Sequence, residues 1–147
     1  HYGDVMQNHR KMGVDYGDKR IGIALSDLLC VISSPYEVYI NRGEEDALKH
    51  LDMLIKQNNV DEVAMGLPLN MDGSEGERAK IHREFGKKLE AYSGVKVHFI
   101  DERLTSAEAE DILISSGVRR EKRKELIDKI AAQLILQTFI DNLKKGK

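Results

Sequence analysis

Three separated acidic positions carry the chemistry that this sequence could perform. Asp15 lies within an apolar segment of strand character, although Asp is depleted in strands. Asp101 and Glu102 follow a second apolar segment, and Asp128 falls in line with the apolar positions of the last expected helix. A carboxylate in such a place is costly unless a partner compensates its charge. A divalent cation is a natural partner, because Mg²⁺ takes oxygen ligands and keeps several waters.

With two bound metal ions, these carboxylates could support phosphodiester hydrolysis. Two ions about 3.5–4 Å apart can stabilise both the attacking and the leaving oxygen in phosphodiester hydrolysis. The set favours Mg²⁺ or Mn²⁺ rather than zinc, since the 5 histidines show no ligand spacing and Cys30 is the single cysteine. Non-catalytic interpretations stay open. Asp128 could be a surface carboxylate near a helix N-terminus, Asp101 and Glu102 could be loop residues, and Glu102 could pair with Arg103.

Basic residues provide candidate contacts to a phosphate backbone. Residues 119–124 hold five cations and one anion, and each contact with a phosphate would release counterions; the alternative is a solvated turn. The loop over residues 66–73 precedes an expected helix N-terminus and is a further candidate anion site, although it has no Walker lysine. The candidate nucleic-acid-binding residues are Arg20, Asn70, Arg78, Arg103, Arg119, Arg120, Lys122, Arg123 and Lys124.

Alternating and helical hydrophobic patterns predict the elements that must position these residues. Strands are expected over residues 12–17, 20–26, 34–40, 60–66 and 95–100. Helices are expected over residues 44–57, from about 75, from about 105 to 117, and from about 123 to 143. Ser74 with Glu77, and Thr105 with Glu108, have the spacing of capping boxes at the second and third of these helices.

The order of these elements predicts an α/β fold with a mixed five-stranded sheet and helices on both faces. Hairpins make the first three strands antiparallel, and right-handed crossovers make the later strands parallel. The first, fourth and fifth strands can then be neighbours, with ligands at their carboxyl ends. One domain is expected over residues 12–143, and residues 1–10 are expected to be a flexible terminus or residues left over from cloning.

Composition excludes several classes of protein. The 147 residues are 41% hydrophobic and 33% charged, which is ordinary for one globular domain and too apolar for a disordered chain. The net charge of −2 gives no general sign of nucleic-acid binding, so that function depends on local patches. No apolar run approaches the roughly 20 residues of a membrane span. No segment resembles a signal peptide, so we expect a cytoplasmic location without a membrane partner.

Four separated motifs closely resemble the YqgF family, whose members are also called RuvX. They are Gly13-Val-Asp-Tyr-Gly17, Gly66-Leu-Pro-Leu-Asn-Met-Asp-Gly73, Asp101-Glu-Arg-Leu-Thr-Ser106, and Lys122-Arg-Lys with Asp128-Lys-Ile-Ala-Ala132. The resemblance covers about residues 12–143 and implies a ribonuclease H-like fold. It also implies a nuclease acting on the 5′ end of precursor 16S rRNA in ribosome biogenesis, with Holliday junction activity proposed for some members.

Carried over to this sequence, the resemblance implies that Asp15, Glu102 and Asp128 form the catalytic and metal-binding set. Asp15 would anchor the metal ions, the other two would complete their shell, and an activated water would attack phosphorus in line. Tyr16 and Asp18 stand where relatives often have Leu and Thr, a departure that leaves the acidic set unchanged.

Two other functions stay open. One is a resolvase of four-way DNA junctions, for which a two-fold junction favours a homodimer. The other is a noncatalytic RNA-binding factor of ribosome assembly, which would bind ribosomal particles without metal-dependent turnover. An ATPase of the actin and sugar-kinase type has a similar Asp-x-Gly hairpin, but 147 residues are too few for its two large domains.

Overall fold

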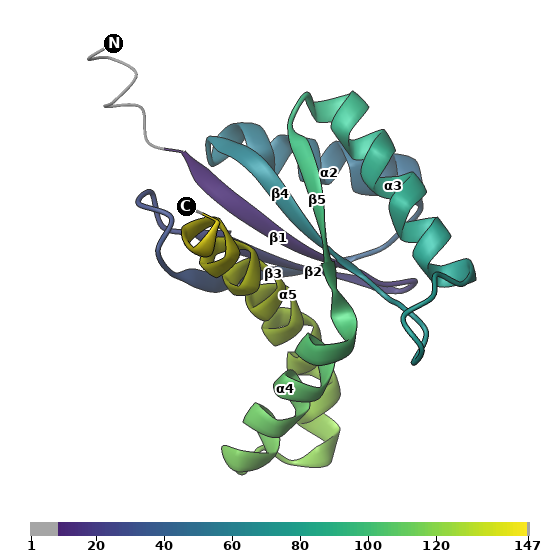
Figure 1. The fold of residues 1–147 in the computed structure, drawn as a ribbon, viewed down its shortest axis with the longest axis vertical. Coiled ribbons are helices and arrows are strands. Elements are labelled where there is room, and N and C mark those ends of the chain that lie inside the picture. Colours follow the sequence, from purple (N-terminus) through teal and green to yellow (C-terminus); the bar gives the residue numbers. More distant parts are fainter. Residues whose placement is uncertain (1–8, 147) are drawn as a thin grey trace.

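A computed structural model describes residues 9–146 of the chain, except for the side chains of residues 104, 106–110, 124 and 125 (Figure 1). The strands are β1 (Arg10–Tyr16), β2 (Arg20–Ser26), β3 (Ser33–Ile40), β4 (Val60–Leu67) and β5 (Lys96–Asp101). The helices are α2 (Glu44–Gln57), α3 (Glu77–Ser93), α4 (Glu102–Ser115) and α5 (Arg120–Lys145).

The five strands form one mixed sheet in the order β3-β2-β1-β4-β5. Strands β1, β2 and β3 are antiparallel neighbours, while β1, β4 and β5 run parallel. This confirms the predicted antiparallel trio joined to parallel strands. It also confirms that the first, fourth and fifth strands are neighbours, so their carboxyl ends meet at one edge of the sheet.

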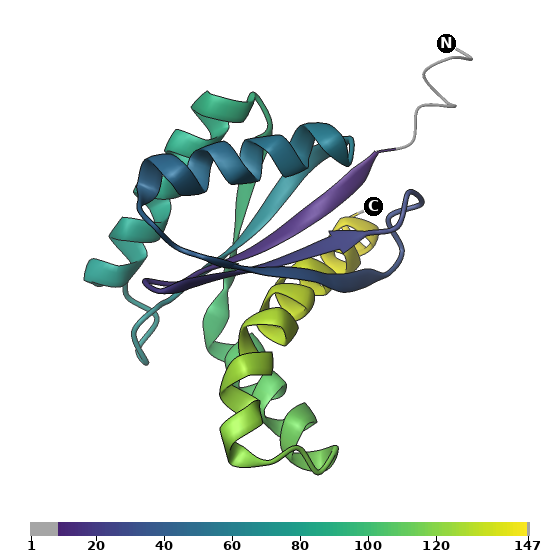
Figure 2. The same ribbon diagram turned by 180° about the vertical axis from the view of Figure 1, so that it is seen from behind.

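Helices cover both faces of the sheet, as predicted. Helices α2 and α3 lie on one face and α5 crosses the other (Figures 1 and 2). Alternation along β2 places Ile21 and Ile23 in the core beneath α2, whereas Ala24 packs against Ile135 and Leu136 of α5. Small residues on the α5 face therefore let that helix lie close to the strands.

A helical hairpin extends the molecule beyond the sheet. Helix α4 packs against the first half of α5, and both figures show this pair projecting past the end of β5. Gly117 follows α4 with a φ of +75°, which fits the predicted end of that helix. No helix in the described part of the chain has the length and apolar character needed to cross a bilayer.

Several predicted boundaries are wrong. Strand β1 begins at Arg10, whose N–H donates to the Asn59 carbonyl at 3.0 Å, so the fold starts before residue 12. Helix α3 begins at Glu77, its N-cap position is Gly76 rather than Ser74, and it has no side-chain cap. The Ser74 hydroxyl donates to Asp72 within the preceding loop. Helix α5 begins three residues earlier than expected and ends at Lys145.

The second predicted capping box is also wrong. Helix α4 begins at Glu102, and its cap is Asp101, whose carboxylate accepts the Arg103 N–H. Thr105 lies in the first turn, where its hydroxyl donates to the Glu102 carbonyl at 3.1 Å. The helix therefore starts directly after β5, which places Glu102 at the edge of the sheet.

Candidate active site

Asp15 stands between two glycines of the neighbouring strands. It pairs with Gly22 of β2, and since Val14 pairs with Met65, the next residue of β4 is Gly66. A Cβ at Gly22 would lie 2.1 Å from the Asp128 carbonyl oxygen. Because these two strands lack side chains here, the groups on α5 and at the start of α4 can approach Asp15.

Asp15 and Glu102 form a hydrogen-bonded acidic pair. The pKa of Asp15 is raised to about 8, first by desolvation and then by the negative charges of Glu102 and Asp128. The positive charge of Arg78 offsets part of this effect. At neutral pH Asp15 therefore holds a proton and donates it in the bond to Glu102.

One oxygen of Glu102 has no hydrogen-bond partner among the described residues. Its Oε2 atom is buried and makes no hydrogen bond within the described part of the chain. The same atom would lie 2.7 Å from a Cβ at Gly66, which shows how tightly it is held against β4. A buried carboxylate oxygen without a partner is costly, and a hard cation is the kind of group that would compensate it.

Asp128 is near this pair but is bound to a different group. It lies on the α5 stripe that includes the buried residues Ala132 and Ile135, as predicted. Its Oδ2 accepts a hydrogen bond from Nε of Arg20 at 3.0 Å. Within the described ranges, no three His, Cys, Asp or Glu side chains stand together closely enough to hold a metal ion. The structure thus brings Asp15 and Glu102 together and leaves Asp128 in an ion pair beside them.

The two adjacent acids at the end of β5 have different partners. Asp101 is bonded to the Arg103 guanidinium, with Nη2 to Oδ2 at 2.6 Å, and this bond lowers the pKa of Asp101. The predicted alternative of a Glu102–Arg103 pair is therefore wrong. Glu102 is the acid that faces Asp15, and Asp101 caps the helix.

The arginines near the acidic pair are engaged in local bonds. Arg78 of α3 pairs with Asp18 at 2.8 Å, and Arg103 also donates to the Met71 carbonyl at 3.2 Å. Asn70 bonds Ser74 and helps close the loop between β4 and α3. Arg78 and Arg103, together with Arg20, place cationic groups around the acidic pair.

The predicted basic segment forms the tip of the α4–α5 hairpin. Arg119, Arg120 and Lys122 are exposed there, whereas Arg123 is half-buried and donates to the Val118 carbonyl at 3.2 Å. The Lys124 side chain lies outside the described part of the structure. At 1.5 Å of rise per residue, Arg120 stands about 12 Å along α5 from Asp128, so the tip is separated from the acidic pair.

The sequence pattern did not single out His82 as part of this site. His82 is buried on α3, and its Nδ1 donates to the Gly66 carbonyl at 2.9 Å from the opposite face of the sheet. Its ring also packs edge-on against Tyr16. Burial lowers the pKa of His82, so the ring is neutral. The available signal was its helical spacing with Ala79 and Phe85, which predicts packing.

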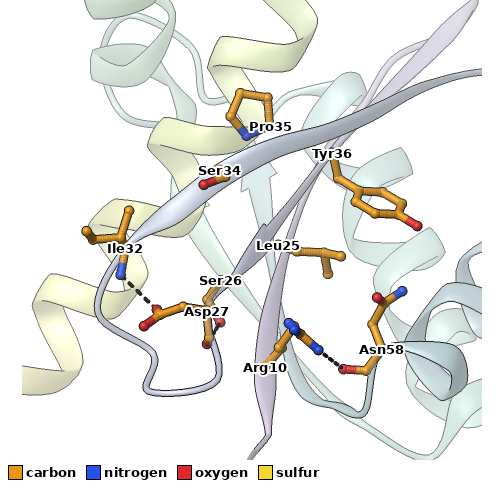
Figure 3. Close-up of a pocket in the computed structure, with 9 residues that line it drawn as sticks. All are labelled: Arg10, Leu25, Ser26, Asp27, Ile32, Ser34, Pro35, Tyr36 and Asn58. Atoms are coloured by element: carbon orange, nitrogen blue, oxygen red, sulfur yellow. Dashed lines mark hydrogen bonds between the residues drawn. The ribbon is translucent and has the colours of Figure 1, made fainter.

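Two hollows differ in their relation to the acids. A small one of about 190 Å³ is lined by Pro68, Leu69, Glu102 and Arg103. A larger one of about 470 Å³ lies at the opposite end of β1 and includes Arg10 (Figure 3). In the larger hollow Asp27 accepts the N–H groups of Val31 and Ile32. None of the three predicted acids lines it, so the smaller hollow is the one that belongs to the site.

Comparisons with known proteins agree with the fold and the motifs. The family model described as "RuvX: Holliday junction resolvase" matches residues 9–142. A protein of Lactococcus lactis subsp. lactis (strain IL1403) named "Putative pre-16S rRNA nuclease" is 45% identical over 134 residues, covering 90% of this chain and 94% of the relative. A protein of Endomicrobium trichonymphae with the same name is 45% identical over 135 residues, covering 90% and 96%.

Solved structures show the same fold at low sequence identity. T. thermophilus RuvC in complex with a Holliday junction substrate has a TM-score of 0.60 and 11% identity, covering 92% of this chain and 96% of that one. The fowlpox virus resolvase with Holliday junction DNA has a TM-score of 0.55 and 17% identity, covering 91% and 98%. These similarities confirm the ribonuclease H-like fold.

Proposed function

Because the chain belongs to the RuvX family, we propose that it is a nuclease whose active site is built on Asp15 and Glu102, and that its substrate is the 5′ end of precursor 16S rRNA. The substrate follows the names of the relatives, which are 45% identical over most of the chain. Processing of a ribosomal precursor would place the protein in the cytoplasm.

The buried acidic pair is the observation that supports catalysis. Among the residues that the structure describes, Glu102 Oε2 lacks a partner, and the negative charge of Glu102 helps to raise the pKa of Asp15. A fold alone would not need two acids held against each other in this way, since each costs free energy. Perturbed acids of this kind cluster at functional sites.

A divalent cation fits this pair. Glu102 and Asp15 would hold it, and Asp128 would complete the set once it leaves Arg20. When bound, such an ion supplies charge neutralisation and Lewis-acid activation for phosphodiester hydrolysis. Asp15 must release its proton before it can act as a ligand, because a metal ligand carboxylate is ionised.

The chain's own cations would bind and orient the nucleic acid. Arg103 lines the hollow beside Glu102, and a guanidinium can bind a phosphate through two parallel hydrogen bonds. Arg119, Arg120 and Lys122 at the hairpin tip would hold a more distant part of the backbone. Such contacts position a backbone without reading its sequence.

A four-way DNA junction is the second candidate substrate. It is favoured by the description of the family as Holliday junction resolvases, and a two-fold junction would call for a homodimer. A noncatalytic RNA-binding role in ribosome assembly is the third candidate. A noncatalytic role gives no reason to keep two buried acids in contact, so the Glu102 oxygen that has no partner among the described residues argues against this role.

One cleavage assay separates these functions. The purified chain is incubated with a 5′-extended 16S rRNA fragment and with a four-way DNA junction, with and without Mg²⁺. We expect Mg²⁺-dependent cleavage of the RNA, abolished by Asp15→Asn and retained by Asp141→Asn, a control at an exposed position of α5. Preferential cleavage of the junction would select the resolvase. Binding without cleavage of either substrate, or full cleavage by Asp15→Asn, would contradict the nuclease proposal.

A further inference from the structure

Arg20 lies on the same face of the sheet as Asp15. It is the first residue of β2, two positions before Gly22, and residues two apart on a strand point to the same face. Gly22 is the partner of Asp15 in the neighbouring strand. The Arg20 side chain therefore reaches over the site from the β2 side and meets Asp128 on α5.

The bond between Arg20 and Asp128 uses a small part of the guanidinium. Nε donates to Oδ2 at 3.0 Å, and among the described residues this is the bond that the Arg20 side chain makes. A guanidinium carries five N–H donors, so its terminal amino groups stay available. The Arg20 side chain is 49% exposed and the Asp128 side chain 21%, which leaves room for Arg20 to move.

Asp128 differs from the other two acids in having a cation already. Asp15 and Glu102 are hydrogen-bonded to each other, whereas Asp128 is paired with Arg20. Among the described residues, the three acids do not form a group that could hold a metal ion. Arg20 holds the Asp128 carboxylate oxygen Oδ2, an atom that a divalent cation bound by all three acids would need as a ligand.

We propose that Arg20 and a divalent cation compete for Asp128, and that Arg20, once displaced, turns its guanidinium to a substrate phosphate. This rests on the proposed function, because it concerns the same acidic site. Arg20 is then a positioning residue that couples metal binding at Asp128 to the binding of nucleic acid. Without metal it holds Asp128 in place of the ion, and with metal it becomes a phosphate ligand.

The competition has a direct consequence for metal affinity. Removing Arg20 frees Asp128, so a divalent cation no longer has to displace an ion pair. A partly exposed ion pair is weak, so we expect Mn²⁺ to bind about two- to fivefold more tightly to the Arg20→Met variant. The opposite change is expected for nucleic acid in the presence of the metal, where loss of the guanidinium removes a phosphate contact.

The test measures Mn²⁺ binding to the full chain without nucleic acid, from the electron paramagnetic resonance signal of free Mn²⁺. Arg78→Met is the matched control, because Arg78 acts on Asp15 through its charge and pairs with Asp18 rather than with Asp128. We expect Arg20→Met to tighten Mn²⁺ binding more than Arg78→Met does. Arg20→Lys keeps the positive charge but lacks Nε, so its Mn²⁺ affinity should lie between those of the wild type and Arg20→Met.

A double-mutant cycle with Asp128→Asn shows whether the effect passes through that carboxylate. In the Asp128→Asn background, Arg20→Met and Arg78→Met should have the same effect on Mn²⁺ affinity. The proposal would be overturned if Arg20→Met and Arg78→Met changed Mn²⁺ affinity equally in the wild-type background, or if Arg20→Met bound Mn²⁺ more weakly than the wild type. It would also be overturned if Arg20→Met still tightened Mn²⁺ binding more than Arg78→Met in the Asp128→Asn background. If Asp15→Asn abolishes binding while Arg20→Met changes nothing, the proposed active site stands and this inference falls. If no Mn²⁺ binds to the wild type, both fall.

Discussion

The backbone of Gly22 lies directly against Asp128: a Cβ at Gly22 would come within 2.1 Å of the Asp128 carbonyl oxygen. Helix α5 can approach the sheet this closely because β2 has no side chain at that point. Gly22 is also the antiparallel partner of Asp15. Because Gly22 has no side chain, the distance between Asp15 and Asp128 is set by the close contact of β2 with α5.

Gly22→Ala should separate the acids and destabilise the fold. The new methyl group would meet backbone atoms of α5, which cannot move aside as the end of a side chain can. Overpacking of this kind costs about 1–3 kcal/mol. We expect a lower free energy of unfolding in urea and a large loss of cleavage. Gly146→Ala, where a Cβ would be 3.4 Å from its nearest neighbour, is the control and should change neither; an unaffected Gly22→Ala would refute the close approach.

Asp15→Asn should change the pH dependence of stability. The pKa of folded Asp15 is raised to about 8, so its proton stabilises the folded state at low pH, and this contribution is lost as the pH rises from about 4 towards 8. The neutral amide has no such loss. The variant should therefore gain stability over the metal-free wild type as pH rises, by at most about 1.4 kcal/mol per pH unit.

Urea unfolding of both proteins in a chelator at pH 4.5 and pH 8 measures this difference. The free energy of unfolding of Asp15→Asn, relative to that of the wild type, should be higher at pH 8 than at pH 4.5. If the difference in free energy of unfolding between the two proteins is the same at both pH values, Asp15 titrates as an ordinary exposed acid.

Local patterns were sufficient to predict where the acids lie, and insufficient to predict their partners. Asp15 in a strand and Asp128 on an apolar stripe are visible in the sequence, because alternation and helical spacing are local properties. Their contacts are not local: Arg20 and Asp128 are 108 positions apart. No spacing rule indicates that Asp128 would meet an arginine, or that Gly22 would be pressed against α5.

The errors at helix starts have a similar cause. Ser74 has the spacing of a cap, but the helix begins after Gly76. The Ser74 hydroxyl instead accepts from Asn70 and donates to Asp72 within the preceding loop. Thr105 has the same spacing, but Asp101 comes earlier and its carboxylate accepts the Arg103 N–H. A capping pattern shows that a side chain could cap a helix, and the competing bonds nearby decide whether it does.

Glu102→Gln should remove the stabilisation that a metal ion provides. Binding to the folded state at a hundred times the dissociation constant adds about 2.7 kcal/mol to the free energy of unfolding. We expect Mn²⁺ to raise the melting temperature of the wild type and to have little effect on this variant. Asp101→Asn is the control: it loses the ion pair with Arg103, an Asn side chain can still cap the helix, and the shift caused by Mn²⁺ should be kept. Equal shifts in wild type and Glu102→Gln would exclude Glu102 as a ligand.

The hairpin tip should contribute to nucleic-acid binding through charge. Replacing Arg119 and Arg120 with Gln should lower affinity, and should reduce the slope of log affinity against log salt by about 0.7–0.9 for each lost phosphate contact. Fluorescence anisotropy over a series of salt concentrations measures both. Lys49→Gln with Lys87→Gln removes two exposed cations from helices on the other face of the sheet. If this control lowers the slope equally, the tip has no special part in binding.

A crystal structure with Mn²⁺ tests most directly that Asp15 and Glu102 form a metal-dependent active site. The anomalous signal should place an ion within about 2.0–2.6 Å of a carboxylate oxygen from each of these two residues. Their mutual hydrogen bond would then be broken, with Glu102 Oε2 no longer unpartnered. Mn²⁺ bound elsewhere, with Asp15 still donating to Glu102, would contradict the account.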